Sequence, residues 1–239
     1  MATDAMAAKG LNRSGIFRII TVVLFTVVQA GIFFIAAGDI NYPRGWVYFA
    51  INACYIIVSM AYIYIRHPEM IELVNERGKF KADNKWWDKL FMAVYSPVIL
   101  GMPALGGLDA VRYEWTALSW MWMYAGCILY ILSSILIHRA MIVNRYFETG
   151  VRIQNDRGHS VVSTGPYSFI RHPGYAGMFG LMLSFPLIVG SLWSLVPAGA
   201  IMAMLVVRTA LEDRMLRAEL SGYAEYAATV RYRLIPYVW

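Results

Sequence analysis

Apolar runs long enough to cross a lipid bilayer are the feature that most constrains how this chain folds. A spanning helix needs about 20 predominantly apolar residues, and four segments meet that requirement: 16–37, 46–65, 90–108 and 117–137. A longer apolar stretch, 174–211, has room for two further helices. Because backbone polar groups inside lipid must be paired within the protein, these runs predict an all-α, polytopic membrane bundle.

The stretch 174–211 is interrupted at Gly190-Ser191, which predicts a tight hairpin of two helices, 174–189 and 192–211. The first of these helices is short and contains Pro186, which removes one backbone hydrogen bond from a helix. Six membrane-spanning helices are therefore expected, and five spans with a re-entrant segment are the alternative.

The composition agrees with a membrane protein and argues against the soluble classes. The chain is 59% hydrophobic and 15% charged, whereas a soluble domain is about 45–50% apolar and about 25% charged. A net charge of +6 suggests nucleic acid as a partner in a soluble protein. In a membrane protein the basic residues instead set the orientation, so we expect the bilayer, and not nucleic acid, to be the partner.

The basic residues lie almost entirely on one side of the predicted spans. Of the 21 Lys and Arg residues, only Arg44 and Arg112 fall on the other side. The residues on the basic side are Lys9, Arg13, Arg18, Arg66, Arg77, Lys79, Lys81, Lys85, Lys89, Arg139, Arg145, Arg152, Arg157, Arg171, Arg208, Arg214, Arg217, Arg231 and Arg233. This asymmetry predicts that both termini and the loops 66–89 and 138–173 are cytoplasmic. It also favours an even number of spans.

The chain therefore divides into two regions. Residues 1–137 hold four spans and the cytoplasmic loop 66–89, and residues 138–239 hold a polar loop, the hairpin 174–211 and a cytoplasmic tail. Both cysteines, Cys54 and Cys127, lie inside apolar runs and are expected to be buried and unpaired, with no metal site.

The polar segment that precedes the hairpin is the first candidate site. Pro173 suits the first turn of a helix, and the free backbone N–H groups of that turn would lie beside Arg171 and His172. Such a helix start favours an anion, and Gly174 and Gly177 would leave room for a flat ligand. The segment predicts a pocket for a small anionic or zwitterionic ligand, and an interfacial loop with a helix cap is the alternative.

The second candidate site lies at the end of the hairpin. Arg208 and Glu212 are four residues apart and share one face of a helix. An ionisable residue at membrane depth is a functional candidate, although a snorkelling Arg208 that pairs with Glu212 is the alternative. The hairpin brings Arg208 and His172 to the same side of the membrane.

Three motifs in this region resemble those of the isoprenylcysteine carboxyl methyltransferase family, which is itself similar to the phospholipid methyltransferases. The first comprises His159, Val161, Val162, Gly165, Tyr167, Arg171, His172, Pro173, Tyr175 and Gly177. The second comprises Arg208, Glu212, Asp213 and Leu216, where Asp213 replaces a Glu of the family, and a looser third comprises Gly222, Tyr223, Tyr226, Arg233 and Pro236. The resemblance extends from about Val151 to the C-terminus.

The resemblance implies methyl transfer from S-adenosylmethionine to a lipophilic small molecule, without an obligatory protein partner. The implied cofactor contacts are His159, Gly165, Tyr167, Arg171, His172, Pro173, Tyr175, Gly177 and Glu212. Arg208 and Glu212 are the implied catalytic residues, with Arg208 orienting an anionic acceptor group, and Tyr223 and Tyr226 would contact the acceptor. The short loops favour a bacterial inner membrane with the site on its cytoplasmic face.

The acceptor itself stays open among a lipid-like carboxylate, a phospholipid amine and a small thiol. A carboxylate is favoured by the resemblance, and it needs no general base because it is already ionised. Two other classes of protein are alternatives, namely a nicotinamide-dependent membrane reductase and a membrane component without catalytic activity.

Overall fold

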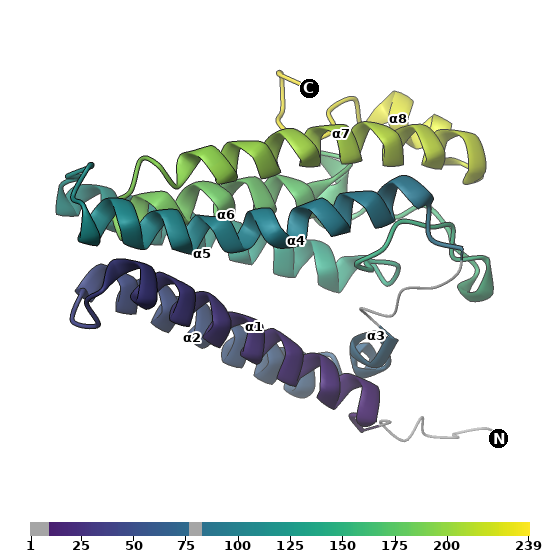
Figure 1. Cartoon of the computed structure of the whole chain (residues 1–239). Coiled ribbons are helices and arrows are strands. Elements are labelled where there is room, and N and C mark those ends of the chain that lie inside the picture. The colour runs from purple at the N-terminus through teal and green to yellow at the C-terminus, as the bar shows by residue number, and fades with distance from the viewer. Residues whose placement is uncertain (1–9, 77–82) are drawn as a thin grey trace.

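The computed structural model describes residues 10–76 and 83–239, and every regular element within them is helical (Figure 1). The six long helices are α1 (Arg13–Ala37), α2 (Pro43–Arg66), α4 (Trp86–Gly107), α5 (Trp120–Val143), α6 (Pro173–Val189) and α7 (Leu195–Glu219). Two short helices, α3 (Ile71–Glu76) and α8 (Tyr223–Thr229), lie in the connections, and α4 continues as a π-helical turn, Leu108–Arg112. The predicted all-α membrane bundle is confirmed.

Among the described residues, five helices are long and apolar enough to cross a membrane, namely α1, α2, α4 with its π-helical turn, α5 and α7. Helix α6 has 17 residues and is about 25 Å long at 1.5 Å per residue, shorter than the ~30 Å hydrocarbon core. It ends at Gly190, whose φ of +86° is left-handed, and α7 begins at Leu195. The tight hairpin is therefore confirmed, with one short and one long arm.

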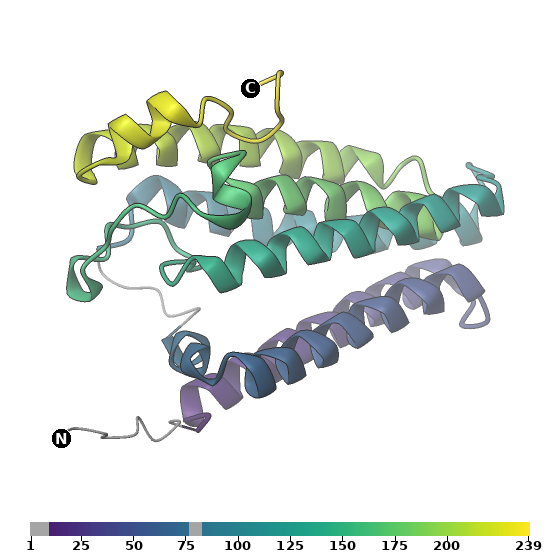
Figure 2. The same cartoon turned by 180° about the vertical axis from the view of Figure 1, so that it is seen from behind.

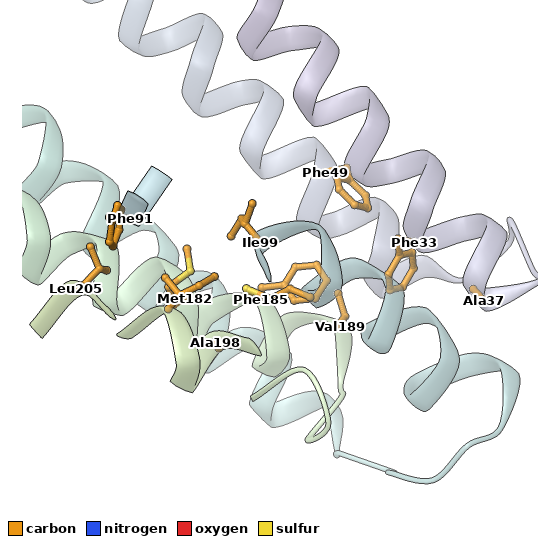
Figure 3. Packing of buried hydrophobic residues seen from close by; sticks show 12 residues of the cluster. Phe33, Ala37, Phe49, Phe91, Ile99, Met182, Phe185, Val189, Ala198 and Leu205 are labelled. Carbon is orange, nitrogen blue, oxygen red and sulfur yellow. The ribbon is translucent and has the colours of Figure 1, made fainter. Parts of the chain in front are cut away.

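The long helices run along a common direction in two groups (Figures 1 and 2). Helices α1 and α2 lie side by side, and α4 to α7 form the second group. A buried aromatic cluster joins the groups, because the ring centroids of Phe33 and Phe185 lie 6.4 Å apart and those of Phe33 and Phe49 lie 6.0 Å apart (Figure 3). The core thus occupies the space where α1 and α2 meet α4 and α6.

Both basic residues on the sparsely charged side bind the carbonyl oxygens of helix ends. Arg44 donates to the carbonyl oxygens of Leu187 and Ile188 at the end of α6. Arg112 donates to Ile35 near the end of α1. The last carbonyls of a helix lack intrahelical donors. These two arginines, which are the exceptions to the positive-inside pattern, therefore stabilise the bundle by binding helix ends.

The polar connections lie at the opposite end of the bundle, the end that carries α3, α8 and the connection from α5 to α6 (Figures 1 and 2). Four of the basic residues counted for the orientation, Lys9, Arg77, Lys79 and Lys81, lie outside the described residues. Cys54 is exposed on the surface of α2, so the expectation that it is buried is wrong, and Cys127 is half-buried. An apolar helix in lipid accommodates an exposed thiol without a polar partner.

Candidate functional site

A cavity opens at the polar end of the bundle, between the connection that follows α5, the start of α6, the end of α7 and helix α8. Eight residues predicted for the site line it: His159, Tyr167, Arg171, His172, Tyr175, Glu212, Tyr223 and Tyr226. The lining does not include Gly165, Pro173, Gly177 or Arg208. Most of the predicted residues thus share one cavity.

The backbone before α6 is held by the C-terminal tail. Pro173 is the first residue of α6, with His172 at the N-cap position. The amide of Arg171 donates to the carbonyl oxygen of Tyr232 at 2.9 Å, and the amide of His172 donates to that of Arg233 at 2.9 Å. These two hydrogen bonds align the segment with the tail and aim the start of α6 at the cavity.

The start of α6 offers hydrogen-bond donors to a ligand. The first N–H groups of a helix have no intrahelical acceptor, and Gly174 and Tyr175 occupy those positions and line the cavity. Nε2 of the buried His172 has no hydrogen-bond partner within residues 10–76 and 83–239, and it lies 3.5 Å from Oδ1 of Asp213. A helix N-terminus beside this nitrogen suits a carboxylate.

Asp213 connects the elements around the cavity without lining it. It accepts two hydrogen bonds from Arg171, from Nε at 2.7 Å and Nη2 at 3.1 Å. It also accepts from the hydroxyl of Tyr223 at 3.1 Å and from Nε of Arg233 at 3.0 Å. The two adjacent acids therefore differ in surroundings, because Asp213 is enclosed by donors and Glu212 faces the cavity.

The carboxylate of Glu212 is oriented by an aromatic residue at the start of α6. The hydroxyl of Tyr175 donates a short hydrogen bond to Oε2 of Glu212. The ring of His172 lies parallel to the Tyr175 ring, with a centroid distance of 5.8 Å and an interplanar angle of 12°. A fixed carboxylate beside two flat rings can receive an ammonium group and a cationic centre.

Arg208 does not line the cavity and binds Asp88 and Thr149 instead. Its Nη2 lies 2.8 Å from Oδ1 of Asp88 on α4 and donates to the carbonyl oxygen of Thr149 at 2.6 Å. The alternative of an intrahelical pair with Glu212 is thus not what the structure shows. Sequence reasoning missed Asp88, although an acid beside a predicted span is itself a signal of a buried partner.

In the connection after α5, sequence reasoning missed Tyr146 and Gln154, which line the cavity together with the predicted His159. The side-chain amide of Gln154 donates to the carbonyl oxygen of Tyr146 at 2.7 Å, and the Tyr146 and His159 ring centroids lie 4.4 Å apart. Burial, together with Arg152 and Arg157, lowers the pKa of His159 to about 4. Nδ1 of this neutral imidazole accepts from the backbone amide of Gln154 at 3.3 Å, so Nε2 carries the proton.

A second turn supports the other side of the cavity. Gly165 has a left-handed φ of +58° and begins the turn Gly165–Ser168, which carries Tyr167. The backbone carbonyl of Tyr167 accepts from the hydroxyl of Tyr226 at 2.7 Å. Burial raises the pKa of Tyr226 to about 12, so this hydroxyl remains a donor, and Gly165 contributes to the cavity by shaping the turn.

The space beside the glycines of α6 is filled by protein. A Cβ at Gly177 would lie 2.5 Å from Cγ1 of Ile137 and 2.9 Å from the carbonyl oxygen of Ser133. A Cβ at Gly174 would lie 2.6 Å from the ring of Phe147. The expectation that the glycines leave room for a flat ligand is therefore wrong for Gly177, which packs α6 closely against α5, whereas Gly174 lines the cavity.

The region of the chain that forms the cavity also matches a known protein family. No curated protein matches the chain. The family model described as phospholipid methyltransferase matches residues 121–221, from the start of α5 to the end of α7. This region supplies all the cavity-lining residues except Tyr223 and Tyr226. The expected resemblance to the phospholipid methyltransferase family is thus confirmed for residues 121–221 of the chain.

Proposed function

We propose that this protein transfers a methyl group from S-adenosylmethionine to a lipophilic or amphiphilic acceptor at the cytoplasmic face of a membrane. The observation that carries the proposal is one cavity that combines the start of α6, the side chain of His172 and the carboxylate of Glu212. These groups lie in or beside the region that matches a methyltransferase family.

The residues fit the polar groups of the cofactor. Its carboxylate matches the N–H groups of Gly174 and Tyr175 together with His172, and its ammonium group matches Glu212. Its sulfonium suits a cavity that is lined by several aromatic side chains. When bound, S-adenosylmethionine supplies an electrophilic methyl group, and the protein contributes by orienting the reactants and excluding water.

The charge distribution supports a cytoplasmic site. The cavity lies at the end of the bundle where the polar connections gather, and nearly all the basic residues are expected at that end. Positive residues remain on the cytoplasmic side of a membrane. A polar cofactor would then enter from water, while the apolar acceptor approaches from the bilayer. The short connections fit a bacterial inner membrane.

A carboxylate acceptor follows from the resemblance to the isoprenylcysteine carboxyl methyltransferases. Its ionised oxygen is already a nucleophile, which agrees with the absence of a conspicuous general base from the predicted motifs. In this version Arg208 would leave Asp88 in part to orient the acceptor, and Glu212 would bind the cofactor.

An amine acceptor is the second candidate, and one observation favours it. Asp88 pairs with Arg208, so the charge of the arginine is already compensated, and Glu212 leaves this side of the cavity acidic. An acidic surrounding attracts an ammonium group and repels a carboxylate. An amine must lose a proton before it is methylated, and because Glu212 is engaged by the ammonium group of the cofactor, that proton would pass to water.

Ligand binding by the purified full-length protein in nanodiscs tests the cofactor proposal. Calorimetry with S-adenosylhomocysteine should show binding, and a concentration 100-fold above Kd should stabilise the protein by about 2.7 kcal/mol. Glu212→Gln should weaken binding, whereas the control Glu219→Gln should not, because Glu219 is exposed on the same helix and pairs with Lys85. Binding of a reduced nicotinamide instead would support the reductase, and binding of neither ligand would support the non-catalytic alternative.

A radiolabelled methyl donor identifies the acceptor class. The donor is mixed with the nanodisc-embedded protein and with a prenylated cysteine, phosphatidylethanolamine or a lipophilic thiol. Label in a base-labile ester supports the carboxylate, and label in the phospholipid headgroup supports the amine. Label in a thioether would contradict both candidates.

A further inference from the structure

A fully buried acid lies directly behind one wall of the cavity. Asp88, on the first turn of α4, has no exposed surface and does not line the cavity. Its Oδ2 accepts from the backbone amide of Val151 at 2.8 Å, and the carbonyl oxygen of Val151 accepts from the amide of Lys85 at 3.1 Å. The start of α4 therefore binds both the amide and the carbonyl group of Val151, which lines the cavity.

The other carboxylate oxygen of Asp88 binds Arg208, which reaches two parts of the cavity. Nη2 of Arg208 lies 2.8 Å from Oδ1 of Asp88 and donates to Thr149. The guanidinium carbon lies 5.3 Å from the ring centroid of Tyr175, the residue that orients Glu212. One ion pair thus joins α4 and α7 to the wall and to Tyr175.

The wall between these contacts is closely packed. Gly150 lines the cavity, and a Cβ at this position would overlap the side-chain amide of Asn84. The chain from Thr149 to Val151 is therefore packed against Asn84 and bonded to the amide of Lys85, and the side chains of Asp88 and Arg208 anchor its two ends. Both anchors are buried, so water does not replace either of them when one is lost.

We propose that Asp88 is a positioning residue for ligand binding: its pairing with Arg208 and its bond to Val151 hold the wall 149–151 and Tyr175 in the geometry that the ligand requires. The identity of the ligand rests on the proposed function, whereas the anchoring of the wall does not. A pair that only stabilised the fold would change the melting temperature and leave the wall and the affinity alone.

The first test measures the wall in the absence of any ligand. Amide hydrogen exchange is followed by mass spectrometry in peptides that cover residues 147–152, for the wild type, Asp88→Asn and Arg208→Gln. Exchange should be faster in both variants. The matched control is Asp109→Asn, which changes another fully buried acid, at the opposite end of the bundle, and should leave these peptides unchanged. Equal exchange in Asp88→Asn and the wild type overturns the proposal.

The second test measures the Kd of S-adenosylhomocysteine for the full-length protein in nanodiscs. Asp88→Asn should weaken binding about tenfold or more, because the buried ion pair that places Arg208 beside Tyr175 is lost. The double variant Asp88→Asn/Arg208→Gln should bind no worse than either single variant, because the two residues act as one unit. Fully additive losses, or an unchanged Kd in Asp88→Asn, overturn the proposal.

The two tests also separate this inference from the proposed function. If the wild type does not bind S-adenosylhomocysteine, the proposed cofactor is wrong, and the exchange experiment still decides whether Asp88 anchors the wall. If a single variant does not fold because it leaves one buried charge uncompensated, the double variant replaces it. Faster exchange at 147–152 in that variant supports the anchoring, and wild-type exchange contradicts it.

Discussion

Arg171 and Asp213 form a buried two-pronged ion pair in which Nε lies 2.7 Å from Oδ1 and Nη2 lies 3.1 Å from Oδ2. The remaining nitrogen of the guanidinium donates to the carbonyl oxygens of Val230 and Arg231. One pair therefore connects α7, the segment before α6 and the C-terminal tail, and it does so beside the cavity that Arg171 lines.

Arg171→Ala should destabilise the protein strongly. Removing one member of a buried ion pair leaves the other charge without its main partner, which costs about 3–5 kcal/mol. The control is Arg217→Ala, because Nε of Arg217 lies 3.1 Å from the same carboxylate but its side chain is 43% exposed. An exposed pair contributes less than about 1 kcal/mol. Thermal unfolding in detergent compares the two, and equal losses would contradict the role assigned to Arg171.

The fold was largely predictable because hydropathy alone determines which segments cross a membrane. The predicted span 117–137 corresponds to α5, and the interruption at Gly190-Ser191 is the observed turn. The largest difference is at α7, which continues to Glu219 instead of ending at 211. Polar residues extend that helix beyond the apolar run, and hydropathy does not detect helix in water.

The site was predictable where its residues lie within the motifs, and it was not where a partner lies outside them and is distant in sequence. His172, Tyr175 and Glu212 line one cavity as expected. The spacing of Arg208 and Glu212 allowed a pair within one helix, whereas Arg208 binds Asp88, 120 positions earlier in the sequence. Local spacing shows which pairs are sterically allowed, but only the packing of α4 on α7 decides between them.

The stability of the protein should fall as the pH falls below neutrality because of His159. Burial, with Arg152 and Arg157, lowers the pKa of this residue from 6.5 to about 4 in the folded protein. Between these two values the unfolded chain binds a proton that the folded chain does not, so acid favours unfolding. The variant His159→Asn keeps an acceptor for the amide of Gln154 and should remove this contribution.

Melting temperatures of the wild type and His159→Asn, measured from pH 7.5 to 4, test this expectation. The difference between the two proteins isolates His159 from the carboxylates that titrate in both. The wild type should lose stability relative to the variant as the pH decreases through this window, and parallel curves would show that His159 is not held neutral.

Asp109→Ala should destabilise the fold without affecting the cavity. Asp109 is fully buried at the other end of the bundle, where Oδ2 accepts from the hydroxyl of Ser191 at 2.6 Å and from the amide of Trp193 at 3.1 Å. Leaving such donors without an acceptor costs about 3 kcal/mol in total. Asp39→Ala, which changes an exposed acid on the same side, should have little effect. The Kd of S-adenosylhomocysteine should stay at the wild-type value, and a weaker Kd would mean that the two ends are coupled.

Gly177→Ala separates a packing role of this glycine from a ligand contact. The added Cβ would lie 2.9 Å from the carbonyl oxygen of Ser133 in α5, and a helix backbone cannot yield as a flexible side chain does. Overpacking of this kind costs about 1–3 kcal/mol. The matched control is Gly199→Ala in α7, where nothing lies within 4 Å of the new Cβ, so the variant should gain about 0.5–1 kcal/mol from helix propensity. Thermal unfolding should therefore shift in opposite directions for the two variants, because α6 depends on a close approach to α5 and this part of α7 does not. A Gly177→Ala protein with the wild-type melting temperature and a weakened Kd for S-adenosylhomocysteine would instead support the direct cofactor contact implied by the family resemblance.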